Sequence, residues 1–264
     1  MRIEGRTFVI SGGASGLGRA TCLTIAKAGG YVAVLDFDES LGTEVVSELG
    51  HEKARFFKVD VSRTESIASA TASIQVWTKD TGKEIGGIVA AAGIGKPAKI
   101  INSKGEPLDL GEFDHIMAVN VRGTVDLCRQ LLPQLTSVTR PIANKGERGV
   151  VILVSSIAAF DGQPGQVAYS ASKGAITSLT LPLTRDLAPH GIRVVTIAPG
   201  VFATGMTGNM GHRAIETLQK VMMWPKRAGR PEEFASLVLE VLGNEMMNGT
   251  VIRLDGGIRM PSKI

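Results

Sequence analysis

The chain has 264 residues, of which 44% are hydrophobic and 20% are charged. This composition supports a sizeable apolar core and excludes a disordered chain, and no run of about 18 apolar residues predicts a membrane span. The formal net charge is +4 without a dense block of lysine and arginine, so we expect no nucleic acid partner, although anionic ligands would fit.

Short β-branched segments alternate with longer segments of helical periodicity along the whole chain. This alternation predicts an α/β fold, a doubly wound parallel sheet with helices on both faces, in one domain over residues 1–264. Helical spacing is clearest in Leu17–Ala28, Ser62–Thr78 and Phe113–Leu135. The expected strands are Thr7–Ile10, Tyr31–Leu35, Arg55–Val59, Gly87–Ala91, Val150–Val154, Arg193–Ile197 and Val251–Leu254.

A glycine-rich turn joins the first expected strand to the first expected helix. It reads Ser11-Gly12-Gly13-Ala14-Ser15-Gly16-Leu17-Gly18. Glycines let a backbone approach a pyrophosphate closely, and the helix N-terminus offers unpaired N–H groups to it. A glycine cluster alone is a weak signal in a chain with 32 glycines, but its position between strand and helix predicts a dinucleotide site.

A carboxylate, Asp36, ends the second expected strand 18 residues after Gly18. In a dinucleotide fold, a carboxylate at this spacing accepts hydrogen bonds from the adenosine ribose hydroxyls and repels a 2′-phosphate. The alternative is that Asp36 only caps the following helix. Neither Ala14, Ser15 nor Phe37 supplies a cation for a 2′-phosphate, so we expect NAD rather than NADP.

Two connections are longer than tight turns require: residues 95–112 and residues 137–149. Long loops in a compact α/β domain are often functional or mobile. The first loop carries Lys96, Lys99 and Lys104. These ammonium groups would meet phosphates at the mouth of a site, or belong to a solvated loop.

Polar residues follow the apolar strand Val150–Val154, where the ends of parallel strands hold their ligands. Ser155 and Ser156 stand at this edge, and a hydroxyl there can hydrogen-bond a reacting oxygen. Asn120 lies on an expected helix beneath the same edge. Its amide would support the chemistry, distort the helix by bonding to the backbone, or do both.

One of the two tyrosines, Tyr169, lies four residues before Lys173. On a helix this spacing puts both side chains on one face. A nearby ammonium would lower the pKa of the phenol, which could then exchange a proton with an alcohol or a carbonyl. By itself a Tyr-x-x-x-Lys pair occurs easily by chance and would fit an ordinary helix surface.

The motifs form a set that spans essentially the whole chain, namely the turn Gly12 to Gly18, Asp60-Val61, Asn120, Ser156, Tyr169-x-x-x-Lys173 and Pro199-Gly200. In order and spacing they resemble the short-chain dehydrogenase/reductase family. In that family the serine lies thirteen residues before the tyrosine, which selects Ser156 over Ser155. The resemblance implies a Rossmann-type sheet of seven strands in the order 3-2-1-4-5-6-7, and a homotetramer.

The resemblance also implies roles for individual residues. Ser156, Tyr169, Lys173 and Asn120 would be catalytic. Asp60 and Val61 would contact the adenine, and the segment after Pro199 would contact the nicotinamide amide. The full implied set of cofactor contacts is Ser11, Gly12, Ser15, Gly16, Leu17, Gly18, Asp36, Asp60, Val61, Ala92, Gly93, Tyr169, Lys173, Pro199, Gly200, Val201 and Thr204.

One position departs from the family pattern. The family usually has Asn-x-Ala-Gly after the fourth strand, whereas this chain has Ala90-Ala91-Ala92-Gly93. Because that asparagine mostly ties strands together, the departure bears on the stability of the sheet rather than on the chemistry.

Segments outside the core motifs resemble one branch of the family, which acts on 3-hydroxyacyl-CoA esters and also on 17β-hydroxysteroids. They include residues 157–166, residues 180–189 and residues 251–260, and both long loops match insertions of that branch. By this analogy Gln163 would help to orient the substrate carbonyl. The residues near 204–230 would form a lid whose Met206, Met210 and Trp224 contact an acyl chain or a steroid.

These observations predict an NAD-dependent dehydrogenase that interconverts a 3-hydroxyacyl-CoA and a 3-oxoacyl-CoA, with no metal. The first alternative is an NAD-dependent secondary-alcohol or hydroxysteroid dehydrogenase, or a biosynthetic ketoreductase, which would not need the basic loop. The second is a non-catalytic scaffold with NAD as a structural ligand. The complete set of Ser156, Tyr169 and Lys173 argues against a scaffold, which has no need to keep them together.

Two features bear on the compartment. With only two cysteines, Cys22 and Cys128, no disulfide framework can form, which favours a reducing compartment. The final residues, Ser262-Lys263-Ile264, differ in one residue from the Ser-Lys-Leu peroxisomal signal. We therefore expect a peroxisomal protein, with a chance polar tail on a cytoplasmic or mitochondrial protein as the alternative.

Overall fold

A computed structural model describes residues 2–138, 146–205 and 221–261 of the chain. The seven strands of its sheet are β1 (Thr7–Ser11), β2 (Tyr31–Asp36), β3 (Ala54–Lys58), β4 (Ile85–Ala90), β5 (Gly149–Val154), β6 (Ile192–Pro199) and β7 (Thr250–Leu254). The α-helices of this part of the chain are α1 (Gly16–Lys27), α2 (Glu39–Leu49), α3 (Thr64–Thr81), α4 (Leu110–Met117), α5 (Thr124–Ser137), α6 (Val167–Leu187) and α9 (Pro231–Gly243).

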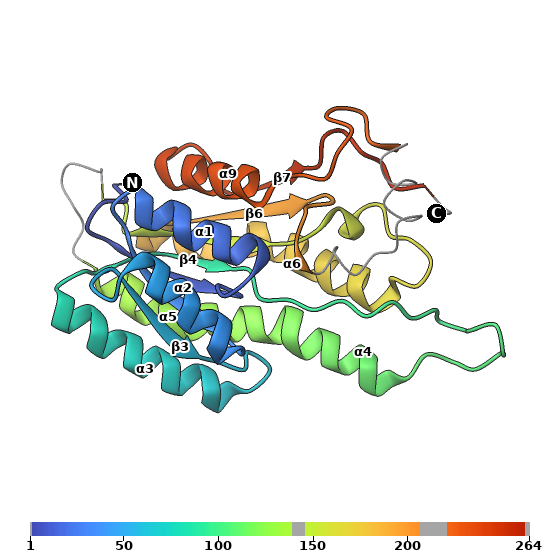
Figure 1. Ribbon diagram of the computed structural model, residues 1–264, viewed down its shortest axis with the longest axis horizontal. Helices are drawn as coiled ribbons and strands as arrows, with labels where there is room; N and C mark the ends of the chain where they lie inside the picture. Colours follow the sequence, from blue (N-terminus) through green and yellow to red (C-terminus); the bar gives the residue numbers. More distant parts are fainter. Residues whose placement is uncertain (1, 139–145, 206–220, 262–264) are drawn as a thin grey trace.

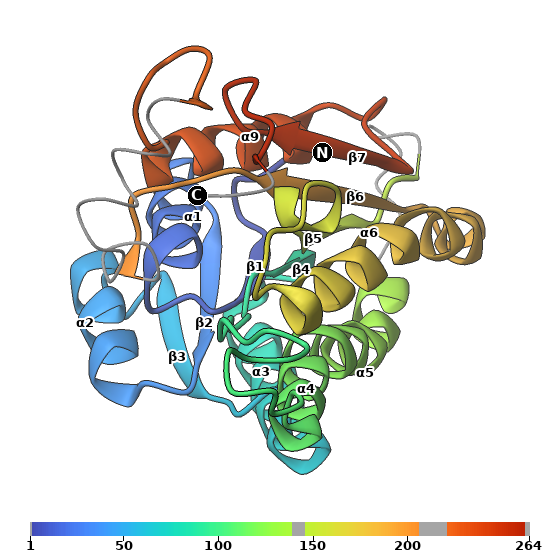
Figure 2. The ribbon, with the colours of Figure 1, turned by 90° about the vertical axis from the view of Figure 1, so that its right-hand side faces the viewer.

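The strands form one parallel sheet in the order β3-β2-β1-β4-β5-β6-β7, which confirms the predicted fold class and strand order. The order reverses between β1 and β4. Since ligands of open parallel sheets bind outside the carboxyl ends of the strands at such a switch point, this topology creates a site there. In Figure 1 the arrows of β6 and β7 end on the right, and Figure 2 looks onto that edge.

Two apolar layers enclose the sheet. Phe8 and Ile10 of β1 belong to the cluster that includes residues of α1, α2 and α9, whereas Val9 belongs to the cluster with α3, α5 and α6. Alternate residues of a strand point to opposite faces, so a strand buried on both faces is apolar throughout. Figure 2 shows these helices on the two sides of the sheet.

The expected helix Phe113–Leu135 is a longer composite element. The π-helical turn η1 (Ala118–Gly123) joins α4 directly to α5. Asp109 begins α4 as its N-cap, because its carboxylate accepts from the amide of Gly111. A π-turn widens the helix by one residue and thereby redirects side chains, and such turns are often found at functional sites.

The first predicted insertion follows β4, at the edge where the strands end, whereas the second precedes β5 and is only partly described. Residues 95–109 form the long loop before α4, in which Ala98 pairs with Gln166 and Ile101 with Pro107. Part of the second loop (139–145) and part of the predicted lid (206–220) lie outside the described residues. Within the described ranges, no helix is long and apolar enough to cross a membrane.

Candidate active site

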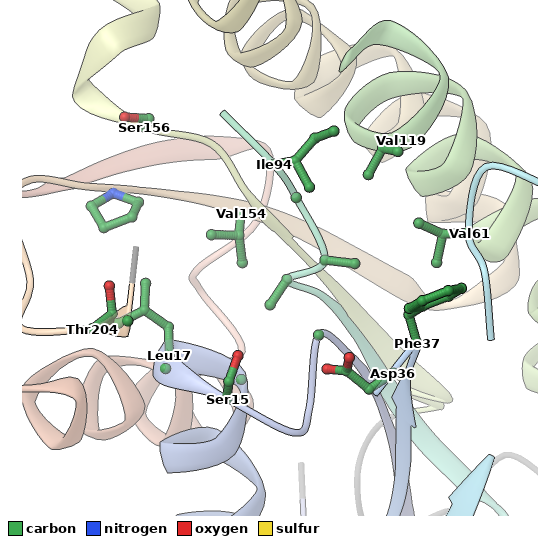
Figure 3. Close-up of a pocket in the computed structure, with 18 of the residues that line it drawn as sticks. Ser15, Leu17, Asp36, Phe37, Val61, Ile94, Val119, Val154, Ser156 and Thr204 are labelled. Carbon is green, nitrogen blue, oxygen red and sulfur yellow. The ribbon is translucent and has the colours of Figure 1, made fainter. Parts of the chain in front are cut away.

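A cavity of about 820 Å³ opens at the switch point between β1 and β4. Figure 3 shows Ser156 at one end of it and Asp36 with Phe37 at the other. Most of the predicted site residues line this cavity, namely Gly12, Ser15, Gly16, Leu17, Gly18, Asp36, Asp60, Val61, Ala92, Gly93, Ser156, Tyr169, Lys173, Pro199, Gly200 and Thr204. Tertiary folding thus brings together residues that are spread over most of the sequence.

The glycine-rich turn needs glycine at specific positions. A Cβ atom on Gly18 would lie 1.9 Å from the carbonyl oxygen of Gly12. Gly12 has a φ of +67°, and a Cβ atom there would lie 2.9 Å from the amide nitrogen of Ala92. Any larger residue would therefore push the turn away from β4. The turn brings the N-terminus of α1 to the cavity, where it can bind a pyrophosphate.

Ser11 holds this turn rather than lining the cavity. Its Oγ accepts a hydrogen bond from the amide of Ala92 at 3.2 Å. The bond ties the end of β1 to the segment after β4. It therefore supplies a link at the place where the family asparagine is replaced by Ala90.

Asp36 stands at the end of β2 and faces the cavity beside Phe37 (Figure 3). Its two carboxylate oxygens accept from the amides of Ala14, at 3.0 Å, and Asp38, at 3.1 Å. The residue that caps α2 is Asp38, whose side chain accepts from the amide of Leu41. The alternative role of Asp36 as that helix cap is therefore wrong.

Ser156 follows β5 directly and begins the 3-10 turn η3 (Ile157–Ala159). Its Oγ accepts from the amide of Ala158 at 3.1 Å, and its hydroxyl is hydrogen-bonded to the side chain of Tyr169. Ser155 has another partner set. Its Oγ donates to the carbonyl of Lys173 at 2.8 Å, which fastens α6 to the sheet. The geometry thus separates Ser156, which contacts the side chain of Tyr169, from Ser155, which supports the helix.

Tyr169 and Lys173 lie on one face of α6, with the Lys173 ammonium 5.8 Å from the centre of the tyrosine ring. Burial lowers the pKa of Lys173 to about 8. Burial also raises the pKa of Tyr169, and the hydrogen bond from Ser156 lowers it by less. The expected lowering of the Tyr169 pKa is therefore wrong, because desolvation of the phenolate outweighs the favourable contact. The Nζ of Lys173 donates instead to the carbonyl of Val154 at 2.9 Å.

Asn120 lies in the π-turn η1 and is buried behind the cavity wall. Its Nδ2 donates to the hydroxyl of Ser172 at 2.9 Å, and that hydroxyl donates to the carbonyl of Tyr169. Its amide also bonds with the backbone of Ile94. The expected bond from Asn120 to backbone in a distorted helix is therefore present, and Ser172 links Asn120 to the backbone of Tyr169.

The predicted substrate residues are less closely gathered. Gln163 donates from Nε2 to the carbonyl of Pro261, and the side chain of Trp224 is 81% exposed. Val201, which was predicted as a cofactor contact, packs beside a small apolar cluster of Ile157, Met222 and Ile258. None of Gln163, Trp224 and Val201 is among the described residues that line the cavity. Met206 and Met210 lie outside the described residues.

Sequence reasoning missed several apolar and aromatic wall residues. Ile94, His115, Val119 and Val154 line the cavity together with the predicted residues. His115 and Val119 are four residues apart, so helical spacing places them on one face. That spacing was a usable signal, but only the fold shows that this face looks toward the cavity.

Comparison with known proteins shows the family of this chain. The chain matches the family described as short chain dehydrogenase over residues 6–214. A 3-hydroxyacyl-CoA dehydrogenase type-2 of Drosophila melanogaster is 40% identical over 259 residues, which cover 98% of this chain and 99% of that protein. The chain therefore belongs to the short-chain dehydrogenase/reductase family, which confirms the resemblance inferred from its motifs.

Two solved structures agree in fold. A 3-hydroxyacyl-CoA dehydrogenase type-2 from Mycobacterium avium matches with a TM-score of 0.91 and 33% identity, covering 98% of both chains. A 3-ketoacyl-(acyl-carrier-protein) reductase from Brucella melitensis, complexed with NADH, matches with a TM-score of 0.83 and 26% identity, covering 98% of this chain and 100% of that one. The chain is thus an oxidoreductase that acts on CH–OH groups of a small molecule, in a family that uses NAD or NADP.

Proposed function

We propose that the protein interconverts a 3-hydroxyacyl-CoA and a 3-oxoacyl-CoA by hydride transfer with NAD. The observation that carries the proposal is the placement of Ser156 and Tyr169 together at one end of a cavity whose other end holds Asp36. A proton-transfer pair and a ribose-binding carboxylate then share one cavity, as a dinucleotide-dependent dehydrogenase requires.

The residues of the cavity fit a nicotinamide dinucleotide. No Cβ atom fits at Gly12 or Gly18, which keeps the turn tight, and the N-terminus of α1 lies at the cavity, where a pyrophosphate would bind. Asp60 and Val61 would contact the adenine, and Pro199, Gly200 and Thr204 would lie beside the nicotinamide. When bound, NAD would supply the acceptor of the hydride and NADH its donor.

Tyr169 would move the proton. In ketone reduction its phenol donates a proton to the carbonyl oxygen, and in alcohol oxidation the phenolate accepts the hydroxyl proton. Ser156, hydrogen-bonded to Tyr169, would hold the substrate oxygen in place. Because burial raises the pKa of Tyr169, its protonated form prevails at neutral pH. That state favours the reduction direction there.

Lys173 and Asn120 would support this step. A Cβ atom on Gly93 would lie 3.2 Å from the Nζ of Lys173, so this ammonium stands beside the segment where the nicotinamide ribose would lie. The chain of hydrogen bonds from Asn120 through Ser172 reaches the backbone of Tyr169. Asn120 would thereby support a proton path from Tyr169 toward solvent.

The preference for NAD rests on the surroundings of Asp36. Its carboxylate faces the cavity beside the exposed ring of Phe37, and the next lining residue of α2 is Leu41. A 2′-phosphate would meet a negative charge and two apolar groups there. The ribose hydroxyls of NAD would instead find an acceptor.

The substrate class is proposed from the relatives and from the loop at residues 95–109. Lys96 forms an ion pair with Glu112, while Lys99 and Lys104 extend from the exposed part of the loop. These two ammonium groups would bind the phosphates of a CoA ester. Gln163 would orient the carbonyl, and the segment around Met206, Met210 and Trp224 would cover the acyl chain.

The alternative is an NAD-dependent dehydrogenase of a free secondary alcohol or hydroxysteroid, or a ketoreductase of a biosynthetic pathway. The exposed apolar side chains of Met223 and Trp224 favour such a substrate as much as an acyl chain. The two functions share the chemistry and differ only in whether the substrate carries phosphates.

The test is NADH consumption with acetoacetyl-CoA beside a free ketone and an oxosteroid, repeated with NADPH. Rapid NADH-dependent reduction of acetoacetyl-CoA supports the proposal. Turnover confined to the free ketone or the steroid assigns the alternative, and equal rates with NADPH contradict the role of Asp36.

We also propose a homotetramer of single-domain subunits that resides in peroxisomes. The assembly is tested by sedimentation of the purified protein. The compartment is tested by deleting residues 262–264, which lie outside the described residues, and imaging the protein in cells. An unchanged distribution would show that the tail is not a targeting signal.

A further inference from the structure

A cluster of ion pairs joins the end of β7 to the segment that follows Ser156. Arg253 of β7 donates to both carboxylate oxygens of Asp161, at 2.6 and 3.3 Å. The same guanidinium donates to Asp255 at 2.8 Å and to the carbonyl of Ile258 at 3.1 Å. Arg253 thus holds both its own C-terminal segment and a distant loop.

This contact is stronger than an ordinary surface ion pair. Only 21% of the Arg253 side chain and 17% of the Asp161 side chain are exposed, and the guanidinium lies 5.1 Å from the ring centre of Phe160. The hydrogen bond from Arg253 holds the pKa of Asp161 below its usual value. Bidentate guanidinium–carboxylate contacts fix geometry as well as contributing energy.

Asp161 is connected to Ser156 through the short turn η3. The amides of Phe160 and Asp161 both donate to the carbonyl of Ile157, and the amide of Ala158 donates to the Oγ of Ser156. Restraining Asp161 therefore restrains a compact unit of six residues, Ser156 to Asp161, whose first side chain contacts Tyr169. The constraint does not reach Tyr169 directly, since that residue lies on α6.

The C-terminal segment also contacts the other walls of the site. The amide of Gly200 donates to the carbonyl of Leu254 at 2.9 Å, and a Cβ atom on Gly200 would lie 2.9 Å from the Cα of Asp255. Ile258 packs with Ile157 and Met222 in one apolar cluster. In Figure 1 the segment after β7 and the segment after β5 lie at the same end of the molecule.

We propose that Arg253 is a positioning residue, which acts through Asp161 and the turn η3 to hold the Ser156 hydroxyl against Tyr169. The inference rests on the proposed role of the Ser156–Tyr169 pair. Neither Arg253 nor Asp161 is among the described residues that line the cavity, so their role in the chemistry is indirect.

The experiment uses the fact that the chain has only two tyrosines. In a Tyr31→Phe background labelled with 13C at the tyrosine ring, one NMR signal reports the titration of Tyr169 without any substrate. Loss of the Ser156 hydrogen bond removes the contact that lowers the pKa of Tyr169, so Ser156→Ala should raise that pKa. We expect Arg253→Ala and Asp161→Asn to raise it too, by about 0.5 to 1 pH unit.

Arg259→Ala is the matched control. Arg259 belongs to the same segment and pairs with Asp255 at 3.3 Å, but it is exposed and does not form the bidentate contact with Asp161. We expect it to leave the Tyr169 titration unchanged. Arg253→Lys should raise the pKa of Tyr169 by less than Arg253→Ala does, because lysine restores the charge without the second hydrogen bond.

Kinetics on whichever ketone the native protein reduces give the second measurement. We expect Arg253→Ala to lower kcat about 10- to 100-fold while the Kd for NADH, from fluorescence titration, stays within about twofold. An unshifted Tyr169 titration in Arg253→Ala and in Asp161→Asn would overturn the inference. So would a Kd for NADH that rises as far as kcat falls, since that describes general loss of structure.

The same variants distinguish a failure of the positioning role from a failure of the proposed function. If Ser156→Ala itself leaves the Tyr169 titration unchanged, the proposed pair fails. If Ser156→Ala shifts it and Arg253→Ala and Asp161→Asn do not, only the positioning role fails. Should Arg253→Ala not fold, Asp161→Asn decides, because it keeps the shape of the side chain and removes only its charge.

Discussion

Asn120 and Ile94 exchange two hydrogen bonds: the amide of Ile94 donates to Oδ1 of Asn120 at 2.8 Å, and Nδ2 of Asn120 donates to the carbonyl of Ile94 at 2.9 Å. This side chain replaces the strand partner that the backbone of Ile94 lacks beyond β4. It therefore joins the cavity wall at Gly93 and Ile94 to the π-turn η1.

Asn120→Ala should destabilise the protein by about 2–3 kcal/mol, because it leaves buried polar groups of Ile94 and Ser172 without their partner. Urea unfolding followed by circular dichroism measures the change. The matched variant is Asn102→Ala, which removes an amide that also accepts backbone hydrogen bonds, but in an exposed loop. We expect that variant to lose less than about 1 kcal/mol; equal losses would contradict a special role for Asn120.

Tyr169→Phe should lower kcat about 100- to 10,000-fold, the usual contribution of a positioned acid or base. The substitution removes only the hydroxyl, so the fluorescence-derived Kd for NADH should stay within about threefold of the native value. Tyr31→Phe is the control, since Tyr31 packs against Trp77 away from the cavity. A kcat near the native value in Tyr169→Phe would show that another group transfers the proton.

The two directions of the reaction should respond oppositely to pH. Because burial raises the pKa of Tyr169, the phenol needed for reduction is present at neutral pH and is lost only as the pH rises toward that raised pKa. Oxidation needs the phenolate and should accelerate as the pH rises. Initial rates in both directions between pH 6 and pH 10 test this, and an oxidation rate that is already level at pH 6 would contradict it.

A second group titrates in the same range. The pKa of Lys173 is lowered to about 8, so its ammonium is present below that pH and is lost above it. The pH profiles will therefore report the pair rather than Tyr169 alone. The Tyr169 NMR signal separates the two, because it follows the phenol directly.

Asp36→Ala should relax the preference for NADH over NADPH by about 10-fold or more, since it removes the charge that opposes a 2′-phosphate. The ratio of kcat/KM for the two cofactors measures the effect, and fluorescence titration with each cofactor checks it without substrate. Asp38→Ala is the matched control, because Asp38 is a neighbouring carboxylate that caps α2 and does not line the cavity. An unchanged ratio in Asp36→Ala would exclude the ribose contact.

Reversing the charges of Lys99 and Lys104 to glutamate should raise the KM for a CoA ester about 10-fold or more and leave the KM for a free ketone unchanged. The effect should shrink at high ionic strength, because exposed charges are screened. Lys79→Glu, which reverses an exposed charge on α3, controls for the net charge of the protein. A KM that changes equally for both substrates would show that Lys99 and Lys104 do not bind the phosphates of a CoA ester.

Local patterns in the sequence predicted the fold class, and the set of motifs indicated the family; the strand order was implied only by the resemblance to that family. Strands buried on both faces are apolar throughout, as in β5. The turn from Gly12 to Gly18 is recognisable in the sequence because nothing larger than glycine fits at Gly18. The spacing of Tyr169 and Lys173 on one helix face is equally local.

Other properties depend on contacts between segments that are distant in the sequence and meet only in the folded chain. Burial raises the pKa of Tyr169, whereas the helix spacing predicted a lowered pKa from Lys173. Ser155 and Ser156 are neighbours in the sequence and look equivalent there. Packing against α6 gives Ser155 the carbonyl of Lys173 as its partner and places Ser156 against Tyr169. The ion pair of Arg253 with Asp161 joins residues 92 positions apart, and no pattern in the sequence could show that they meet.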